Sequence, residues 1–289
     1  MNIIKTIKSV MYLSKSKHAI TIPIDELLAS AKRCMMSYKD PNELLDIIDD
    51  KMPHKISEFI KEELKDISPR FITDNTNTDA QAYVYSKKNK GKNVHIVFRG
   101  TSSYKDVIHD VQLSSILYGT KKERSIRIHS GFMCQYNSIK NAIYDFIRNE
   151  LGDTVYVSGH SLGGALAQIA AVDISERFGC KVVCHTFGSP RVGDSDFVEW
   201  FDNNVKESYR VINVKDIVPN IPMRPLWHHS MRNAISLSKD GYVKKLTYDI
   251  SPLKRLYIFF KTFNIIKPKN DHSCGIYIDR LELIASCNL

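Results

Sequence analysis

Residues 155–164 read VYVSGHSLGG, and this stretch decides the fold. Its first residues are apolar and β-rich, which is typical of a buried strand, and an alanine-rich stretch of helical character follows over 162–178. Ser161 lies at the junction, with Gly159 two residues before it and Gly163 two residues after it. A nucleophile on such a tight strand-to-helix turn has a strained backbone and needs neighbours without bulky side chains. The stretch therefore predicts a nucleophilic serine at the end of a strand.

Strand and helix patterns alternate along most of the chain. We expect helices over 25–39, part of 56–66, 131–149, 162–178 and 195–204, and strands over 80–86, 93–100, 154–159, 181–188 and 208–214. The lysine-rich turn between the first two strands predicts a hairpin. The repeated strand-helix-strand order favours an α/β fold, with a mostly parallel central sheet and helices on both faces.

The composition is that of a single globular domain. The chain has 289 residues, of which 43% are hydrophobic and 25% are charged. This length is enough to build one large core. The polar stretch 72–80 is only a short loop and not a domain linker. We therefore expect one domain over 1–289, with residues 1–24 as a peripheral extension.

The net charge of +9 favours contact with anionic surfaces, such as the headgroups of acidic lipids. The lysines are scattered and form no recognisable nucleic-acid-binding module, so no specific nucleic acid is expected as a partner. A solvated basic surface accounts for the charge equally simply. No obligate protein partner is evident from the sequence.

The N-terminal residues do not follow the pattern of a signal peptide, because Lys5, Lys8, Lys15 and Lys17 interrupt the apolar residues. No apolar run approaches the roughly eighteen residues that a membrane span needs. The six cysteines lack C-x-x-C spacing, so neither a zinc site nor a redox motif is expected. These features favour an intracellular, cytoplasmic location, with peripheral membrane contact as an alternative.

A serine hydroxyl needs a base to become a good nucleophile, and the base needs a carboxylate that orients it. In this kind of elbow architecture the acid follows the serine in the chain and the histidine comes last. Asp216 is the predicted acid, because it follows an apolar strand and precedes a loop with prolines. The competing acids lie in a loop or on a surface helix, where capping or solvated roles are expected: Asp194, Asp196 and Asp202.

His272 is the predicted base, because it lies in a late connecting segment before an apolar helix. His229 remains the alternative. It lies with His228 a dozen residues after the acid, in a segment typical of a packing strand. His160 lies inside the elbow and is expected to be a structural neighbour of the serine.

Acyl transfer creates an oxyanion that needs more than one hydrogen-bond donor. The backbone N–H of Leu162, directly after the serine, is one candidate donor. Thr101 is a second candidate, because it follows the strand 93–100 and offers an amide and a hydroxyl at the same edge of the sheet. Alternatively, Thr101 or Ser102 caps a helix over 104–111.

Six segments together resemble the class 3 lipases, an α/β-hydrolase family typified by secreted fungal triacylglycerol lipases. The segments are HIVFRGTSSYKDVIHDV, IHSGFMCQY, VYVSGHSLGGALAQIAA, HTFGSPRVGD, YRVINVKDIVPNIP and DHSCGIYI. They occur in the family's order over residues 80–280. The resemblance implies an α/β-hydrolase fold, with Ser161 as nucleophile, Asp216 as acid and His272 as base.

The same resemblance implies an oxyanion hole made by Thr101 and Leu162. The serine hydrolase mechanism requires no metal or organic cofactor. Residues 102–111 correspond to the mobile lid helix of the family. This stretch is short and rather polar here, so strong interfacial activation is not expected. The secreted members carry signal peptides and disulfides, so an intracellular setting and a different lipid are expected for this chain. Residues 253–267 mix aromatic and aliphatic residues with lysines, which favours core packing, with an acyl-pocket rim or a membrane contact as alternatives.

The favoured function is a serine ester hydrolase that acts on lipid carboxylic esters, a triacylglycerol or related acylglycerol lipase, through an acyl-enzyme intermediate. A phospholipase or a carboxylesterase for soluble esters remains an alternative, because pocket shape decides the substrate and the sequence does not display it. A lipase-like binding module without turnover is the alternative from another class. Such modules usually lose one residue of the triad, whereas this sequence has all three.

Overall fold

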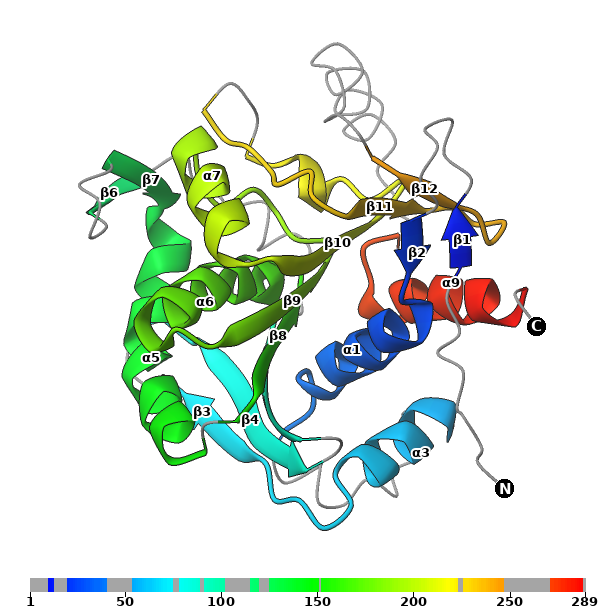
Figure 1. Cartoon of the computed structure of the whole chain (residues 1–289). Helices are drawn as coiled ribbons and strands as arrows, with labels where there is room; N and C mark the ends of the chain where they lie inside the picture. The colour runs from blue at the N-terminus through cyan, green and yellow to red at the C-terminus, as the bar shows by residue number, and fades with distance from the viewer. Residues whose placement is uncertain are drawn as a thin grey trace.

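The computed structural model describes residues 10–12, 20–40, 54–74, 78–88, 91–101, 115–119, 125–150, 152–222, 226–246 and 271–287. In these residues an eight-stranded sheet runs through the middle of the molecule, and helices cover both of its faces (Figure 1). Two smaller sheets join β1 (Val10–Tyr12) to β2 (Ile20–Ile22) and β6 (Ser115–Gly119) to β7 (Ser125–His129). This is the α/β arrangement that the alternating sequence pattern predicts.

The strand order across the large sheet is β12-β11-β10-β9-β8-β5-β4-β3. Its strands are β3 (Arg70–Thr73), β4 (Gln81–Lys88), β5 (Lys92–Phe98), β8 (Thr154–His160), β9 (Lys181–Phe187), β10 (Glu207–Asn213), β11 (Ala234–Leu237) and β12 (Val243–Lys245). The central strands β11, β10, β9, β8 and β5 run parallel, and antiparallel strands lie at both edges. Strands β4 and β5 form the expected hairpin. The prediction of a mostly parallel sheet is therefore confirmed.

Two sets of helices pack on opposite faces of this sheet (Figure 1). One face carries α5 (Ser130–Glu150), α6 (Leu162–Phe178) and α7 (Ser195–Asn204), and the other carries α1 (Ile24–Met36), α3 (His54–Glu63) and α9 (Cys274–Ser286). Successive residues of a strand point to opposite faces, so Ile96 belongs to the first core and Val97 to the second. Burial on both faces explains why the central strands are nearly continuous apolar runs.

The first turns of helix α6 are buried on all sides. Every residue from Gly163 to Val172 is buried, as expected for a helix without a polar face. The helix packs against β8 and β9 of the sheet and against α5 and α7. The turn that joins β8 to α6 is therefore held from both ends by the core.

The sequence patterns do not predict the short strands β3, β6, β7, β11 and β12, which have three to five residues each. The expectation of a loop over 72–80 is wrong at its start, because Ile72 and Thr73 belong to β3 and pair with Ala82 and Gln81 of β4. A run of four residues is too short to show a clear period of two. The pairing with β4, and not the local sequence, makes this segment a strand.

The segment 1–24 is not wholly peripheral. Ile22 and Ile24 at its end are each 1% exposed and belong to the core beneath α1 and α9. The stretches 102–111 and 253–267, for which the sequence predicts a lid helix and a packed or membrane-contacting segment, lie outside the described residues. Among the helices that are described, none is long and apolar enough to cross a membrane.

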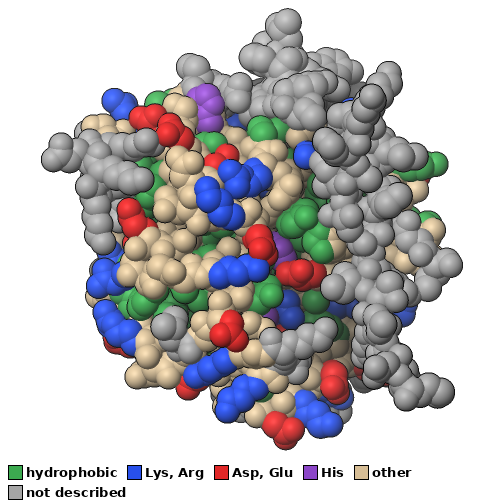
Figure 2. Space-filling model, in the orientation of Figure 1, with side chains coloured by type: hydrophobic (Ala, Val, Ile, Leu, Met, Phe, Trp, Pro, Cys, Tyr) green, Lys and Arg blue, Asp and Glu red, His purple; other side chains and the backbone are tan. Residues whose placement is uncertain are grey.

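Charged side chains of both signs are spread over the surface. Figure 2 shows one face of the molecule, on which Lys and Arg side chains lie among Asp and Glu side chains and do not gather in one patch. This agrees with the scattered lysines of the sequence. On the face shown, the charged side chains therefore form no localised basic patch.

Candidate active site

Ser161 is the single residue between the end of β8 and the start of α6. Its φ of 59° and ψ of −129° lie in a region that non-glycine residues rarely adopt. Two backbone hydrogen bonds fix this conformation: Ser161 N donates to Phe187 O over 2.9 Å, and Gly164 N donates to Ser161 O over 2.9 Å. The predicted strained elbow is therefore present. The Ser161 side chain does not cap α6, which excludes a plain capping serine.

The glycines around Ser161 are required by close backbone contacts. A Cβ atom on Gly159 would overlap the carbonyl of Gly163. A Cβ atom on Gly163 would overlap the carbonyl of Phe98 and lie 2.9 Å from the carbonyl carbon of Arg99, both at the end of β5. The two glycines therefore allow α6 to start directly against β8 and β5.

The structure brings Ser161, Asp216 and His272 into one hydrogen-bonded line. His272 Nε2 lies 2.7 Å from Ser161 Oγ, and His272 Nδ1 lies 2.8 Å from Asp216 Oδ2. A carboxylate accepts hydrogen bonds, so Nδ1 carries the proton and donates a hydrogen bond to Asp216. Nε2 is then the acceptor for the Ser161 hydroxyl. This is the tautomer that a histidine needs in order to take a proton from serine.

These three residues come from three different loops. Two of the loops follow parallel strands, and the third precedes a helix. Ser161 follows β8, Asp216 follows β10, and His272 lies two residues before α9. The carboxyl ends of the strands of an open parallel sheet meet at one edge, where loops converge. The topology thus places side chains that lie 56 and 111 residues apart in the chain within hydrogen-bond distance.

The carboxylate of Asp216 is fully buried and accepts two further hydrogen bonds. Tyr277 Oη donates to Oδ2 over 2.6 Å, and the backbone N–H of Val218 donates to Oδ1 over 2.9 Å. Burial raises the pKa of Tyr277 well above its ordinary value, so the phenol stays protonated and remains a donor. Gly188, with a φ of 60°, makes room for this cluster, because a Cβ atom there would lie 2.8 Å from Asp216 Oδ2 and 2.9 Å from Tyr277 Oη.

Sequence analysis did not single out Tyr277. The residue lies on the buried face of α9, where an aromatic side chain looks like any other core residue. Its spacing of five residues from His272 gives no hint of a contact with Asp216, which is 61 residues away in the chain.

The alternative acids and bases are engaged elsewhere. Asp194 is the N-cap of α7, and its side chain accepts from Phe197 N over 3.0 Å, as the sequence predicts. Asp202 accepts from Ser230 Oγ over 2.6 Å. His229 Nε2 lies 2.6 Å from the carbonyl of Pro219, to which it donates. Asp196 is exposed in the first turn of α7, and His228 pairs with the backbone of Gly193.

His160 lies beside the line of three residues without belonging to it. Its Nε2 lies 2.6 Å from the main-chain carbonyl of His272, and its Nδ1 lies 2.7 Å from Tyr38 Oη. The ring is buried, and its centroid is 4.7 Å from that of the His272 ring. It is therefore a structural neighbour of the serine, as expected.

The two predicted oxyanion donors lie next to the elbow. Leu162 is the first residue of α6, where backbone N–H groups have no partner within the helix. Thr101 is half-buried and follows β5, whose Phe98 pairs with Gly159 of β8. A Cβ atom on Gly100 would overlap the carbonyl of His160, so the backbone before Thr101 packs directly on the elbow. The role of both donors stays a prediction.

No metal is implied by the site. Within the described parts of the chain, no group of three His, Cys, Asp or Glu side chains could hold a metal ion. All six cysteines lie in these parts and are free thiols, and Cys34, Cys184 and Cys274 are buried.

Comparison with known proteins finds a lipase family model and proteins named as lipases. Residues 95–225 match the model of the family described as "Lipase (class 3)". A lipase of Rhizopus niveus is 31% identical over 153 residues, which are 50% of this chain and 38% of that protein. A secreted mono- and diacylglycerol lipase of Malassezia globosa is 28% identical over 169 residues, covering 55% of this chain and 56% of that protein. The chain therefore spans about two fifths to just over half the length of these relatives.

A solved triacylglycerol lipase, described as having a serine protease triad at its catalytic centre, has a TM-score of 0.65 to this structure. It is 22% identical, and the match covers 92% of this chain and 96% of that chain. At this identity the likeness shows the fold alone. The predicted α/β-hydrolase fold is thus confirmed, and the resemblance noted in the sequence has an independent counterpart in three dimensions.

Proposed function

Because residues 95–225 match the class 3 lipase family, we propose that this chain belongs to that family and is a serine ester hydrolase that cleaves lipid carboxylic esters, a triacylglycerol or related acylglycerol lipase. The observation that carries the proposal is the buried line from Asp216 through His272 to Ser161, built on a strained elbow. Strained backbone of this kind concentrates at functional sites. The names of the relatives, a lipase and an acylglycerol lipase, support the substrate class.

In the first half of the reaction, Ser161 Oγ attacks the carbonyl carbon of the ester while its proton moves to His272 Nε2. Asp216 stabilises the imidazolium that forms, because its carboxylate already accepts the Nδ1 proton. The backbone N–H groups of Leu162 and Thr101 donate to the oxyanion. The ester C–O bond then breaks, and the alcohol leaves with the proton from His272. The acyl group stays on Ser161.

In the second half, water attacks the acyl carbon and gives a proton to His272. The tetrahedral intermediate collapses, the proton returns to Ser161, and the fatty acid leaves. No step requires a cofactor, because the proton donor, the proton acceptor and the oxyanion donors all belong to the chain. The chemistry fits any carboxylic ester, so the acyl chain and headgroup depend on the walls of the site.

The test is a panel of esters of increasing acyl length, presented below and above their aggregation limits. The control is Ser161→Ala, which keeps the fold and removes only the hydroxyl. We expect turnover by the unaltered chain and a fall of about 10⁶-fold in kcat for Ser161→Ala. A fluorophosphonate probe should label Ser161. No labelling together with no turnover would favour a binding module that has kept the fold without catalysis.

Peripheral contact with anionic membranes is a subsidiary part of the proposal. The net charge of +9 supports it, and the face shown in Figure 2 carries charges of both signs without one basic patch. A liposome series that differs only in anionic lipid, assayed at low and high salt, tests it. Equal rates across the series would contradict the membrane contact and leave the hydrolase untouched.

The proposed location is the cytoplasm, where the six free cysteines would stay reduced. The Malassezia relative is named as secreted, so the location is an independent question. Fractionation of cells that express the full chain with a C-terminal tag would answer it.

A further inference from the structure

We infer that Tyr38, acting through His160, is a positioning residue that holds the main chain of His272 and so keeps its imidazole between Asp216 and Ser161. The inference rests on the proposed function, because it concerns the residue to which we give the role of base. It adds a contribution from Tyr38, two residues after the end of α1 and outside the matched family region 95–225.

The hydrogen bonds have only one consistent direction. A main-chain carbonyl can only accept, so His160 Nε2 carries a proton and donates it to the carbonyl of His272 over 2.6 Å. In a neutral imidazole the other nitrogen is then an acceptor. Tyr38 Oη must therefore donate to His160 Nδ1 over 2.7 Å. The chain of donors runs from Tyr38 to His160 to His272.

The charge states of both side chains support this direction. Burial and the neighbouring His272 lower the pKa of His160 well below its ordinary value, so the ring stays neutral. Burial raises the pKa of Tyr38 well above its ordinary value, so the phenol keeps its proton. Neither group loses its hydrogen-bonding role across the pH range in which a serine hydrolase works.

The phenol of Tyr38 lies where three loops meet. Its oxygen approaches Gly100 so closely that a Cβ atom there would overlap it, and the same Cβ atom would overlap the carbonyl of His160. Gly100 directly precedes Thr101, the proposed oxyanion donor. One hydroxyl group thus contacts the oxyanion loop, the elbow and, through one imidazole, the loop of the base.

The residues on either side of His272 have anchors of their own, and Ser273 after it is the N-cap of α9, accepting from Ile276 N. Asn213 Nδ2 donates to the carbonyl of Asp271 over 2.8 Å, and the Asp271 carboxylate pairs with Arg280. These contacts hold the residue before the base, whereas His160 holds the carbonyl of the base itself. Without the proton on His160 Nε2, two acceptors would face each other, and the backbone of His272 would move away from the elbow.

The experiment compares Tyr38→Phe with the matched control Tyr85→Phe. Tyr85 is also a buried tyrosine on the α1 side of the sheet, but its hydroxyl donates to Glu63 over 2.9 Å and contacts no residue of the site. His160→Gln keeps an N–H donor near the position of Nε2, and His160→Leu removes it. Each variant, and the double variant Tyr38→Phe with His160→Leu, is assayed for kcat and KM on a soluble ester and for its melting temperature.

We expect Tyr38→Phe to lower kcat about tenfold with KM changed less than about twofold, because it misplaces the base and not the substrate. Tyr85→Phe should keep kcat within about twofold of the unaltered chain. His160→Gln should retain more activity than His160→Leu. The double variant should match His160→Leu, because the effect of Tyr38 on the position of the base passes through His160.

A second readout needs no turnover. The ¹⁵N shifts of histidine ring nitrogens distinguish the two neutral tautomers, and His160 should carry its proton on Nε2 from about pH 5 to about pH 9. Tyr38→Phe should mix the two tautomers, whereas Tyr85→Phe should leave the spectrum unchanged. This measurement on the unaltered chain holds even if a variant fails to fold.

A proton on Nδ1 of His160, or equal kcat values for Tyr38→Phe and Tyr85→Phe, would overturn the inference while the hydrolase proposal stands. Additive effects of Tyr38→Phe and His160→Leu would also overturn it. An unaltered chain without turnover or fluorophosphonate labelling would instead overturn the proposed function, and the positioning role with it. The failures of the two proposals are thus distinguishable.

Discussion

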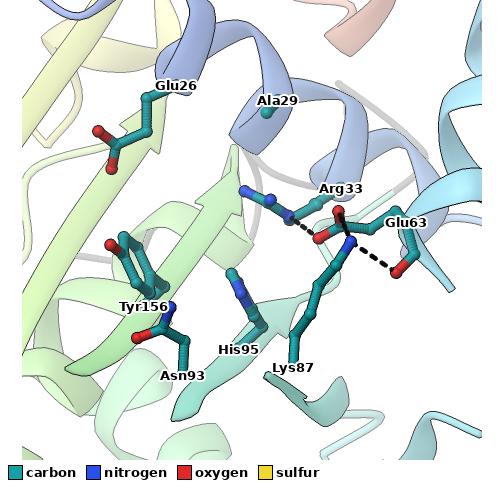
Figure 3. A pocket seen from close by; sticks show the side chains of 8 residues that line it. All are labelled: Glu26, Ala29, Arg33, Glu63, Lys87, Asn93, His95 and Tyr156. Carbon is teal, nitrogen blue, oxygen red and sulfur yellow. Dashed lines mark hydrogen bonds and ion pairs between the residues drawn. The ribbon is translucent and has the colours of Figure 1, made fainter. Parts of the chain in front are cut away.

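Two clusters of polar side chains lie towards opposite ends of strands β5 and β8. At the carboxyl ends is the site of Ser161, Asp216 and His272. Towards the amino ends, below α1 and α3, is a cavity of about 170 Å³ lined by Glu26, Ala29, Arg33, Glu63, Lys87, Asn93, His95 and Tyr156 (Figure 3). Both clusters contain buried carboxylates, tyrosines and histidines, so residue types alone do not tell them apart.

The difference lies in what each carboxylate contacts. In the cavity, Glu63 accepts from Arg33 Nε and Lys87 Nζ, each over 2.7 Å (Figure 3). It also accepts from Tyr85 Oη over 2.9 Å. Burial alone would raise the pKa of Glu63, but Arg33 and these hydrogen bonds lower it to about 2. The charge of this carboxylate is therefore cancelled in the resting protein.

At the site, the hydrogen bonds that Asp216 accepts come from neutral groups: a phenol, a backbone N–H and an imidazole. Its negative charge meets a positive charge only when His272 takes a proton. An acid that is to stabilise a transition state must keep this capacity in the ground state. The comparison indicates that the cavity stabilises the fold and that the elbow end is built for proton transfer.

The strongest way to break this comparison is Asp216→Asn. An amide cannot stabilise an imidazolium, and its NH₂ group would face either the proton on His272 Nδ1 or the N–H of Val218. We expect kcat to fall about 10⁴-fold with the fold intact. The control is Asp202→Asn, whose hydrogen bond to Ser230 lies away from the site. A fall of similar size in both variants would contradict the assignment of the acid.

The complementary change in the cavity is Glu63→Gln. It leaves Arg33 and Lys87 without their carboxylate, and the Glu63 side chain is only 7% exposed. We expect a loss of about 2 kcal/mol in the free energy of unfolding at neutral pH, with kcat unchanged within about twofold. The pKa of Glu63 is lower in the folded state than its ordinary value of 4.5, so this stabilisation is complete above about pH 4.5 and is lost as the pH falls to about 2.

Urea unfolding at pH 7 and at pH 3 checks this expectation, with the exposed neighbour Glu62→Gln as the matched control. The gap between Glu63→Gln and the unaltered chain should narrow at pH 3. A gap of the same size at both pH values would show that the effect does not come from the carboxylate charge. A large loss of kcat would contradict the independence of the two clusters.

The two clusters also differ in how well the sequence predicts them. The elbow was predictable because glycine spacing, strand pattern and helix pattern all converge within the ten residues 155–164, and β8 and α6 meet where expected. The acid and the base follow from chain order, because the ends of parallel strands meet at one edge. The structure brings Asp216 and His272 to Ser161 as predicted, while their catalytic roles remain proposals.

The remaining parts depend on contacts that no local pattern encodes. Tyr38 meets His160 across 122 residues, Tyr277 meets Asp216 across 61, and Arg33 meets Glu63 across 30. In the sequence, Tyr38, Tyr277 and Arg33 look like ordinary members of helices. The short strands β3, β11 and β12 were missed for the same reason, since their existence depends on a neighbouring strand and not on their own three or four residues.

A smaller effect that sharpens the comparison is expected for Tyr277→Phe. The variant removes one of the two donors to Asp216 Oδ2 and leaves the backbone N–H of Asn213 without the phenol oxygen 3.1 Å away. We expect kcat to fall about fivefold with little change in KM, because the misplaced carboxylate orients His272 less well. The control Tyr85→Phe removes the corresponding phenol donor to Glu63 and should leave kcat unchanged. Equal losses in the two variants would mean that the phenols serve only the core.

The smallest effect at neutral pH is expected for His95→Phe. This variant tests whether the His95 ring in the cavity takes up a proton in the folded chain. The His95 ring is stacked between Tyr85 and Tyr156, with ring centroids 4.9 Å and 5.1 Å away, and phenylalanine keeps this stack. Burial and the nearby Arg33 lower the pKa of His95 to about 3, with Lys87 acting in the same direction and Glu63 against it.

The unfolded chain therefore takes up a proton at His95 below about pH 6.5, whereas the folded chain does not until about pH 3, so stability is lost as the pH falls through this window. His95→Phe removes this loss. We expect its urea midpoint to fall less between pH 7 and pH 4 than that of the unaltered chain, with similar midpoints at pH 7. If the urea midpoints of the two proteins fall equally with pH, His95 takes up its proton in the folded chain as well. The cavity would then resemble the elbow end, because it would hold a group that can exchange protons.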